Sequence, residues 1–448
     1  MSVHLADSVV YGHLWSTEEA RKLLDEEPRF RAWLEILSAL AHAQAEVGLI
    51  PIEAARRITR YADSAPIDLE RIAAETRATG HSTLGLIRVL RAELPESVRE
   101  WVYYGATVQD VTDTWTASVM QKVGDYLERD LARLEAAALG LARRHRTTPM
   151  MGRTHAQPAL PIPFGYKAAV WAAELGRHRQ RLEQGRPRRE VVQLGGALGT
   201  LEFWGDQSLA LIDAFARRMN LRVPPIPWIT ARDGPAEFVH LLAMVSTTLA
   251  KIGNEIMELQ RPEIAEVREP FIVGTVGSIT MPQKRNPELS EHLDTLGRLV
   301  RADADVMTEA MIQLHERDGR AWKAEWIALP EAVSFTLAAT RYAILLLEGL
   351  EADQEQMRAN IDARKGFVFA EPVMRALADQ VGKHTAHDII YQAAMRAVEG
   401  GWSFEEALMQ DPRVADHLSR SDLEGLADIE TVMGAGPQLV DRVIEAAG

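Results

Sequence analysis

The segment GTVGSITMPQKRNPELSE, from Gly274 to Glu291, gathers residue types that can bind anions and move protons. The Lys284 ammonium and the Asn286 amide can hold a carboxylate or an oxyanion. The Ser278 hydroxyl can act as a nucleophile or base once it is activated. Glycines allow backbone amides to approach a ligand and allow a loop to open and close. Composition alone equally allows a mobile surface loop with a helix starting near Pro287.

Two other polar segments interrupt the chain. In YYGATVQDVTDT (Tyr103–Thr114), Thr107 can cap a following helix and Asp110 favours its first turn, but a helix N-terminus can also bind a carboxylate. In MGRTHAQPALP (Met151–Pro161), His155 lies shortly before a proline, where the chain tends to be extended and accessible. A single histidine is more often structural than catalytic. Each segment alone therefore keeps a structural and a functional interpretation.

The elements that must position these residues are long helices. Three stretches place apolar residues three or four positions apart, and such helices bury their stripes best against one another in a bundle. A fourth stretch, Phe335–Leu350, is apolar on most faces and is expected to be central. The three stripes are Val119, Val123, Leu127, Leu131, Leu134, Ala138 and Leu141; Leu241, Val245, Leu249, Ile252, Ile256 and Leu259; and Leu289, Leu293, Leu296, Val300, Ala304, Met307, Met311 and Leu314.

Strand signals are sparse, and only REVVQL and REPFIVGT are short candidates. A chain of 448 residues is too long for one compact core. We therefore predict an all-α protein with an N-terminal helical domain over residues 1–112, a central long-helix bundle over 113–359 and a C-terminal helical domain over 360–448.

Composition excludes several classes of function. The formal net charge of −14 argues against nucleic acid as a partner, so basic groups that bind an anionic ligand must be concentrated locally. The absence of cysteine excludes disulfides, thiolate metal sites and cysteine nucleophiles. The N-terminal sequence shows no secretory signal, and the apolar run YAILLLEGL is too short to span a membrane. We expect a soluble, cytoplasmic protein.

The three polar segments together resemble a known family. GSITMPQKRNPELSE resembles the signature loop of the fumarase/aspartase superfamily, commonly written G-S-S-x-M-P-x-K-x-N, and GRTHAQPA and YYGATVQDVTDT resemble its other two shared segments in the same order. QLGGALGT (Gln193–Thr200), RDGPAEF (Arg232–Phe238) and NIDARKGFVFAEPV (Asn360–Val373) extend the resemblance over nearly the whole chain.

The resemblance implies a three-domain, all-α chain whose long central helices form a twenty-helix core in a homotetramer. Each active site would combine the three segments from three different chains, and no metal or organic cofactor would take part. Members of the family remove a proton β to a leaving group from a succinyl-type substrate, through a carbanion stabilised as an aci-carboxylate, and usually release fumarate.

The resemblance also implies roles for individual residues. Ser278 matches the general base, and Lys284 and Asn286 match the groups that hold the substrate carboxylate and stabilise the intermediate. His155 matches the histidine that protonates the leaving group, and Glu291 matches a carboxylate paired with that histidine. The remaining positions expected to contact substrate are Thr107, Gln109, His81, Thr154, Gln157, Met281 and Arg232.

Three positions depart from the usual pattern of the family. Ile279 replaces the second serine of the loop, Val108 replaces a serine after Thr107, and Ala231 stands where a glutamine is common. Each change removes a hydrogen-bonding side chain, so we expect a substrate with fewer or different polar groups there.

The sequence most resembles the branch that contains adenylosuccinate lyases and 3-carboxymuconate cycloisomerases. LHERDGRAWKAEWIALPEA (Leu314–Ala332) lies on the cycloisomerase side, and it lacks the serine-rich, phosphate-contacting stretch of adenylosuccinate lyases. Val10 and Tyr11 stand where an Arg-Tyr pair would bind the AMP phosphate, which disfavours purine biosynthesis. His155 is retained, although bacterial cycloisomerases often lack it, and this favours an acid-assisted elimination.

We therefore predict a lyase that cleaves a C–N bond in a small anionic dicarboxylate, a substituted succinate or aspartate, releasing an amine or nitrite and giving fumarate. The alternatives are 3-carboxy-cis,cis-muconate cycloisomerase, adenylosuccinate lyase and an inactive structural homologue of the kind found among eye-lens crystallins.

Overall fold

Long helices dominate the computed structural model, which describes residues 4–271, 274 and 276–447. The chain is 70% helical, so the all-α fold predicted from the apolar stripes is confirmed. The longest helices are α8 (Val108–Arg144), α9 (Phe164–Arg189), α11 (Asp233–Gln260), α12 (Glu288–Ala310) and α13 (Gly319–Gly349).

The predicted stripes are buried, with one exception. Every predicted position on α8 and α11 is at most 5% exposed. On α12 the stripe stops early, because the helix ends at Ala310 and leaves Met311 and Leu314 43% and 48% exposed. The prediction was wrong for these two residues. The fourth helix, α13, begins well before the predicted Phe335 and contains Pro330 in its interior.

Contacts divide the chain into two compact units, and each of the five long helices contributes residues to both. Unit 1 comprises Met1–Asp130, His178–Ala250 and Leu293–Arg341. Unit 2 comprises Leu131–Arg177, Lys251–His292 and Tyr342–Gly448.

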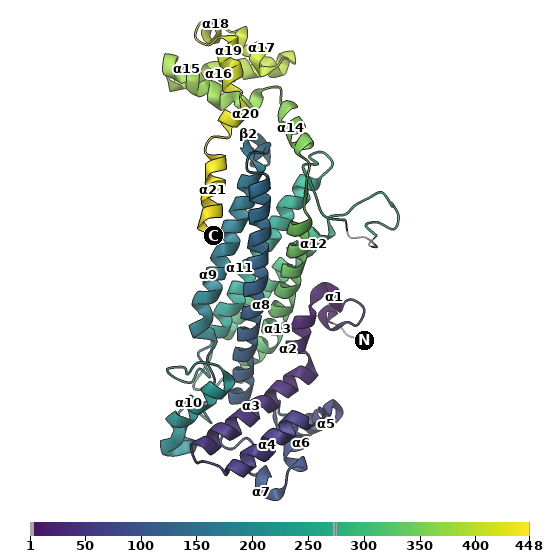
Figure 1. Ribbon diagram of the computed structural model, residues 1–448, viewed down its shortest axis with the longest axis vertical. Helices are drawn as coiled ribbons and strands as arrows, with labels where there is room; N and C mark the ends of the chain where they lie inside the picture. Colours follow the sequence, from purple (N-terminus) through teal and green to yellow (C-terminus); the bar gives the residue numbers. More distant parts are fainter. Residues whose placement is uncertain (1–3, 272–273, 275, 448) are drawn as a thin grey trace. The chain divides into compact units, whose positions relative to one another are not determined.

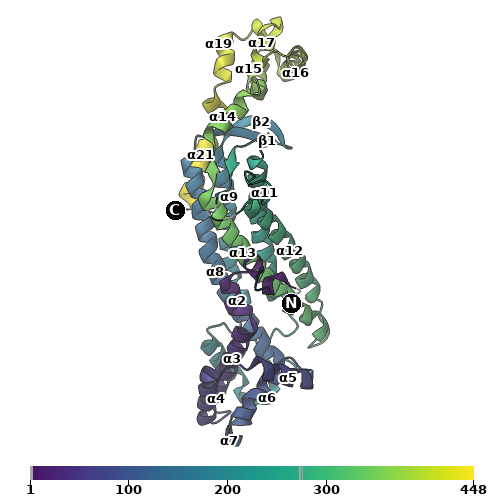
Figure 2. The same ribbon diagram turned by 90° about the vertical axis from the view of Figure 1, so that its right-hand side faces the viewer.

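In unit 1, polar bridges join neighbouring long helices inside the bundle. His178 of α9 bonds Thr248 of α11 at 2.8 Å, and Ser246 of α11 bonds Thr336 of α13 at 3.1 Å. Helix α3 packs against α4 and α10, and α3 to α7 lie together in both views (Figures 1 and 2). The shorter elements of this unit are η1 (Leu5–Asp7), α1 (Gly12–Trp15), α2 (Glu18–Leu24), α3 (Glu26–Glu46), α4 (Ile52–Ser64), α5 (Leu69–Thr79), α6 (Leu84–Glu93), α7 (Glu96–Arg99), η2 (Glu202–Gln207) and α10 (Ser208–Met219).

In unit 2, the same long helices are joined by other contacts. Lys167 of α9 pairs with Glu255 of α11 at 2.6 Å, and the rings of His292 and Tyr342 stack with centroids 4.7 Å apart. The C-terminal helices α15 to α19 form a small core of their own and lie together in both views (Figures 1 and 2). The shorter helices of this unit are α14 (Gln354–Asp362), η3 (Phe367–Phe369), α15 (Ala370–Val381), α16 (Lys383–Gly400), α17 (Phe404–Met409), α18 (Pro412–Ala415), α19 (Arg420–Leu426), α20 (Ile429–Val432) and α21 (Gly436–Ala446).

Unit 2 also holds two small antiparallel sheets. Strands β1 (Pro149–Thr154) and β2 (Gln157–Pro163) form a hairpin, which the sequence predicted only as an extended segment. Strands β3 (Val267–Arg268) and β4 (Glu351–Ala352) form the second sheet. Of the candidate REPFIVGT, which begins at Arg268, only Arg268 lies in a described strand, while Ile272, Val273 and Thr275 lie outside the described residues. The candidate REVVQL forms a single bridge, between Val191 and Arg222 in unit 1.

Helix α13 is long and apolar enough to cross a membrane by composition alone. However, 78% of its apolar window is buried inside the structure, as in the core helix of a soluble protein.

A buried carboxyl in unit 1 makes stability depend on pH. Asp303 of α12 is 7% exposed, and burial, reinforced by nearby Glu331, raises its pKa to about 7. His4 contacts Glu331 at 3.0 Å from the other side. Because the folded state holds this proton more tightly than the unfolded state, the stabilisation is complete below the ordinary carboxyl pKa and is lost as pH rises through about 7.

We therefore expect Asp303→Asn to stabilise the protein by about 1–2 kcal/mol at pH 8 and by less at pH 5. Thermal unfolding at the two pH values measures the difference. Asp305→Asn, at an exposed position of the same helix, is the matched control and should show no such pH dependence. A variant at position 303 that is less stable than the wild type at pH 8 would contradict this interpretation.

Candidate active site

The signature loop of unit 2 is organised by short-range hydrogen bonds around Ser278. The Met281 amide donates to Ser278 Oγ at 3.0 Å, and the Lys284 amide donates to the Met281 carbonyl at 2.9 Å. The Asn286 side-chain amide donates to the Gly277 carbonyl at 2.8 Å. Short-range hydrogen bonds thus connect Ser278, Met281, Lys284, Asn286 and Gly277 within one loop.

The loop lines a cavity of about 970 Å³, here called the loop cavity. Its walls include Ser278, Ile279, Lys284 and Asn286. Arg268 and Arg285 add cationic groups to those walls, and the Arg285 guanidinium lies over the Phe271 ring at 4.8 Å. Among the described residues, Lys284 has no ion-pair partner. The lining thus carries three cationic side chains against two carboxylates, Glu269 and Glu288, and Glu269 is occupied by amides of α12. This leaves the local positive charge that an anionic ligand requires in an acidic protein.

Glu269, before the loop in sequence, is hydrogen-bonded to the start of α12, which follows the loop. Its carboxylate accepts hydrogen bonds from the Leu289 and Ser290 amides at 3.1 and 2.9 Å and from Ser290 Oγ at 2.5 Å. These amides begin α12, where a carboxylate is favoured by the exposed N–H groups. Burial nevertheless raises the pKa of Glu269, and the neighbouring Glu291 carboxylate adds to this. Glu291 itself lies exposed in the first turn of α12.

His155 lies at the tip of the β1–β2 hairpin. His155 and Ala156 both have positive φ, 52° and 61°, as a two-residue hairpin turn requires. Gly152 sits at a bulge in β1, where a Cβ would come within 2.4 Å of the Leu160 carbonyl oxygen. The side chains of Thr154, His155 and Gln157 are exposed, and none bonds another described residue. The hairpin therefore presents all three for contacts outside it.

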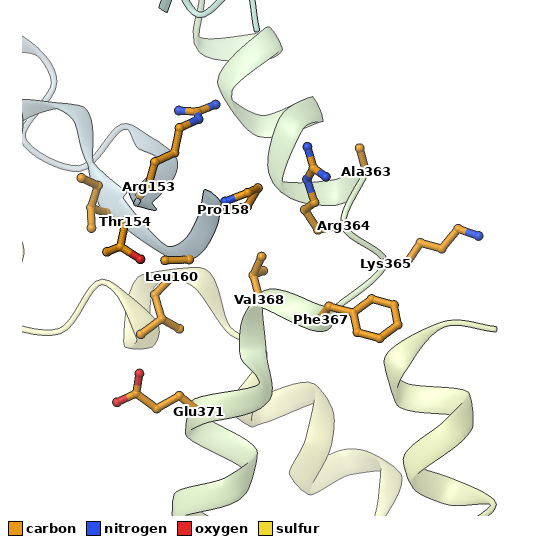
Figure 3. A pocket seen from close by; sticks show the side chains of 13 residues that line it. Arg153, Thr154, Pro158, Leu160, Ala363, Arg364, Lys365, Phe367, Val368 and Glu371 are labelled. Carbon is orange, nitrogen blue, oxygen red and sulfur yellow. The ribbon is translucent and has the colours of Figure 1, made fainter. Parts of the chain in front are cut away.

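Beside the hairpin lies a second cavity of about 880 Å³, here called the hairpin cavity. Figure 3 shows Thr154 and Leu160 of the hairpin beside Val368 of η3 and Glu371 of α15. The loop cavity and the hairpin cavity share no lining residue among the described ones. No contact joins His155 to Ser278 or Glu291 in the described part of this chain.

The first polar segment lies in unit 1 at the start of α8. Asp110 accepts hydrogen bonds from the Thr107 and Gly195 amides at 2.8 and 2.7 Å, so it ties the helix start to the QLGGALGT loop. Thr107 Oγ1 accepts a hydrogen bond of 2.6 Å from Arg317, which also bonds the Gly196 carbonyl at 3.1 Å. Sequence reasoning missed Arg317 as a site residue, although it lies in the HERD segment used to choose the branch.

Gln109 and Arg232 are buried inside unit 1, at 2% exposure each. Arg232 forms two-pronged ion pairs with Asp113, at 2.8 and 3.1 Å, and with Glu325, at 2.8 and 2.6 Å. Gln109 donates to Asp113 at 3.2 Å and to the Ile229 carbonyl at 3.1 Å. The guanidinium and the amide are thus occupied by protein groups, so we propose a positioning role for both residues.

His81 is exposed in unit 1, and its ring nitrogen lies 3.4 Å from both the amide and the hydroxyl of Thr83. Apart from His81, the predicted residues therefore fall into three clusters: the loop, the hairpin, and the start of α8 with Arg232. Among the described residues, no group of three or more His, Asp or Glu side chains is arranged to hold a metal ion.

Comparisons with known proteins identify the family of this chain. Residues 14–301 match the family described as Lyase, and residues 366–443 match the one described as Adenylosuccinate lyase C-terminus. An N-acetyl-S-(2-succino)cysteine lyase from Dickeya dadantii is 37% identical over 100% of this chain and 98% of its own.

Two solved structures share the fold over nearly their whole length. A fumarate lyase from Mesorhizobium sp. BNC1 has a TM-score of 0.90 and 37% identity, covering 96% of this chain and 98% of its own. A 3-carboxy-cis,cis-muconate lactonizing enzyme from Pseudomonas putida has a TM-score of 0.91 and 33% identity, covering 98% and 99%.

The chain therefore belongs to the Lyase family and is a lyase of the fumarase/aspartase superfamily. Within that superfamily it falls in the branch of adenylosuccinate lyases and 3-carboxymuconate cycloisomerases.

Proposed function

We propose that this protein eliminates the sulfur substituent of an S-(2-succino) thioether, such as N-acetyl-S-(2-succino)cysteine, and releases fumarate and a thiol. The full-length similarity to a lyase of that name carries the choice of leaving group. It replaces the amine or nitrite predicted from the sequence with a thiol, while the succinyl half of the substrate stays the same.

The proposed reaction begins at Ser278. Its oxygen removes a proton from the carbon next to the C–S carbon, and the electron pair of that C–H bond moves into the adjacent carboxylate to give an aci-carboxylate. The pair then returns to form the C=C bond as the C–S bond breaks and its electron pair leaves on sulfur. Serine needs its oxyanion to act as a base, and the Met281 amide pointing at Oγ supports that form.

Lys284 and Asn286 would stabilise the charge that develops on the substrate carboxylate. Both line the loop cavity with Ser278, and the cationic Arg268 lies in the same walls. Preformed donors of this kind are the largest contributors to catalysis of reactions with an anionic intermediate.

His155 would protonate the departing sulfur, with Glu291 orienting it. The exposed side chains of the hairpin support a site completed by other chains, so we propose the homotetramer, with each site shared by three chains, as the active form. We also propose that the chain is divided into the three domains predicted from the sequence, with limits at residues 112 and 359.

Ile279 is 94% exposed on the wall of the loop cavity, where the family usually has a serine. An apolar side chain there suits a thioether, which accepts hydrogen bonds only weakly. We propose this as the reason for the departure at this position.

A substrate panel tests the proposed function. Purified protein would be incubated with N-acetyl-S-(2-succino)cysteine, an N-substituted aspartate, nitrosuccinate and 3-carboxymuconate, and fumarate or lactone would be followed by ultraviolet absorbance. We expect the highest kcat/KM for the thioether. Turnover of 3-carboxymuconate alone would instead assign the lactonizing activity for which the Pseudomonas putida relative is named.

The role of His155 predicts a dependence on the acidity of the leaving group. With His155→Asn, we expect kcat to fall about 10²-fold for an alkyl thioether, and by less than about threefold for an aryl thioether, whose thiolate leaves without a proton. Ala156→Gly, at the other residue of the same turn, whose φ of 61° glycine also adopts, is the control for disturbance of the hairpin. Equal losses for the two thioethers in the His155 variant would refute the assignment of the acid.

A further inference from the structure

Two carboxylates flank the short strand β3, and each is bound by a different part of the candidate site. Glu266 precedes the strand and is completely buried, while Glu269 follows it. Only the two residues of β3 separate them, and β3 is fixed by its pairing with β4.

Glu266 holds the hairpin. Arg153 of β1 donates two parallel hydrogen bonds to its carboxylate, both 2.8 Å long, and Asn360 of α14 donates a third at 2.9 Å. Asn360 also bonds the Ile264 carbonyl at 2.8 Å. Arg153 lies two residues before His155 in the sequence, so this buried carboxylate fixes the strand that carries the proposed proton donor.

Glu269 holds the signature loop. Its carboxylate binds the Leu289 and Ser290 amides at the far end of the loop, and its own amide donates to Gln260 Oε1 at 2.6 Å. The chain that carries Ser278 is therefore tied at both ends to one residue. The next residue after Ser290 is Glu291, the proposed partner of the histidine.

Together these contacts connect the hairpin and the loop to one short, rigid frame. A two-pronged arginine–carboxylate pair fixes direction as well as distance, because its two bonds are parallel and planar. Displacement of a catalytic group by about 1 Å can cost about 10²-fold in rate, so such a frame matters for turnover beyond its effect on folding.

We propose that Glu266 and Glu269 are positioning residues, with Glu266 setting the proton donor and Glu269 setting the base. The assignment rests on the proposed function. It also extends the candidate site to Arg153 and Asn360, which act through Glu266 and contact no substrate.

The two halves of this frame predict different kinetic signatures. Glu266→Gln keeps the shape of the side chain but loses the charge that aligns Arg153, so we expect kcat to fall about tenfold for an alkyl thioether and less than about twofold for an aryl thioether. Glu269→Gln displaces the base, so we expect about a tenfold loss for both substrates. KM should change by less than about threefold in either variant, because Glu266 is completely buried and the Glu269 carboxylate is occupied by the Leu289 and Ser290 amides.

Controls separate positioning from folding. Asp441→Asn breaks a two-pronged but exposed pair with Arg146, at 2.7 and 2.6 Å, elsewhere in unit 2 and should leave both rates unchanged. The double variant Arg153→Gln with Glu266→Gln leaves no buried charge unpaired, and it provides the measurement if the single variant does not fold. We expect it to show the same dependence on the leaving group.

The outcomes distinguish failure of the proposed function from failure of the positioning roles. If the wild type converts neither thioether, the proposed function fails. If the wild type converts both and Glu266→Gln lowers them equally, or lowers neither, the positioning role of Glu266 is overturned. If Glu269→Gln leaves kcat for the aryl thioether unchanged, the positioning role of Glu269 is overturned.

Discussion

Replacement of Ser278 by alanine is expected to lower kcat at least about 10³-fold with an S-(2-succino) thioether while leaving the assembly and its thermal stability intact. The variant removes one oxygen, which accepts a hydrogen bond from the Met281 amide. The turn around it keeps its other hydrogen bonds, including that from Asn286 to Gly277.

The matched control is Thr280→Ala, which deletes a hydroxyl from the same loop at an exposed position. We expect it to retain kcat within about threefold, because a surface hydroxyl without a buried partner contributes little. Steady-state assays of fumarate formation measure both variants. Residual activity of Ser278→Ala within about tenfold of the wild type would show that another group removes the proton.

Arg232→Met is expected to destabilise the protein by about 3–5 kcal/mol. Its guanidinium is buried between Asp113 and Glu325, and deleting it leaves two carboxylates inside the protein without their partner. Burial already raises the pKa of Glu325, so loss of Arg232 favours protonation of that carboxyl. Asp113 also holds Gln109 and the Trp322 indole, so the start of α8 should loosen with it.

Chemical unfolding of Arg232→Met and of Arg188→Met compares a buried pair with an exposed one. Arg188 pairs with Glu237 in the same unit, with the two side chains 55% and 46% exposed, and its loss should cost less than about 1 kcal/mol. If Arg232→Met has normal stability but a greatly raised KM, Arg232 binds substrate directly, as the resemblance implied, and the positioning role is refuted.

Regular periodicity explains which parts of the fold were predictable. The stripes of α8 and α11 follow the helical period without interruption, and all their members are buried. On α12 the apolar spacing continues through Met311 and Leu314 although the helix has ended, so spacing alone overextended it. The hairpin was predicted only as an extended segment, because the residue before a proline favours extended backbone but this preference does not specify a pairing partner. The prolines are tolerated because a two-stranded sheet has only edges.

The candidate site was predictable where its residues are close in sequence. Ser278, Lys284 and Asn286 lie within one short loop, so their grouping could be inferred from spacing. The ion pair between Arg153 and Glu266 joins positions 113 residues apart, so neither segment alone predicts its partner. For Arg232, the sequence alone does not show whether the guanidinium contacts substrate or the two buried carboxylates that the structure places beside it.

The central claim is elimination of a thiol from a succinyl thioether, and the most direct test is the stoichiometry of the products. Purified protein would be incubated with N-acetyl-S-(2-succino)cysteine, with fumarate followed by ultraviolet absorbance and free thiol by a colorimetric thiol reagent. We predict equal amounts of fumarate and N-acetylcysteine with the wild type and neither product with Ser278→Ala. Absence of both products with the wild type, or thiol release without fumarate, would contradict the account.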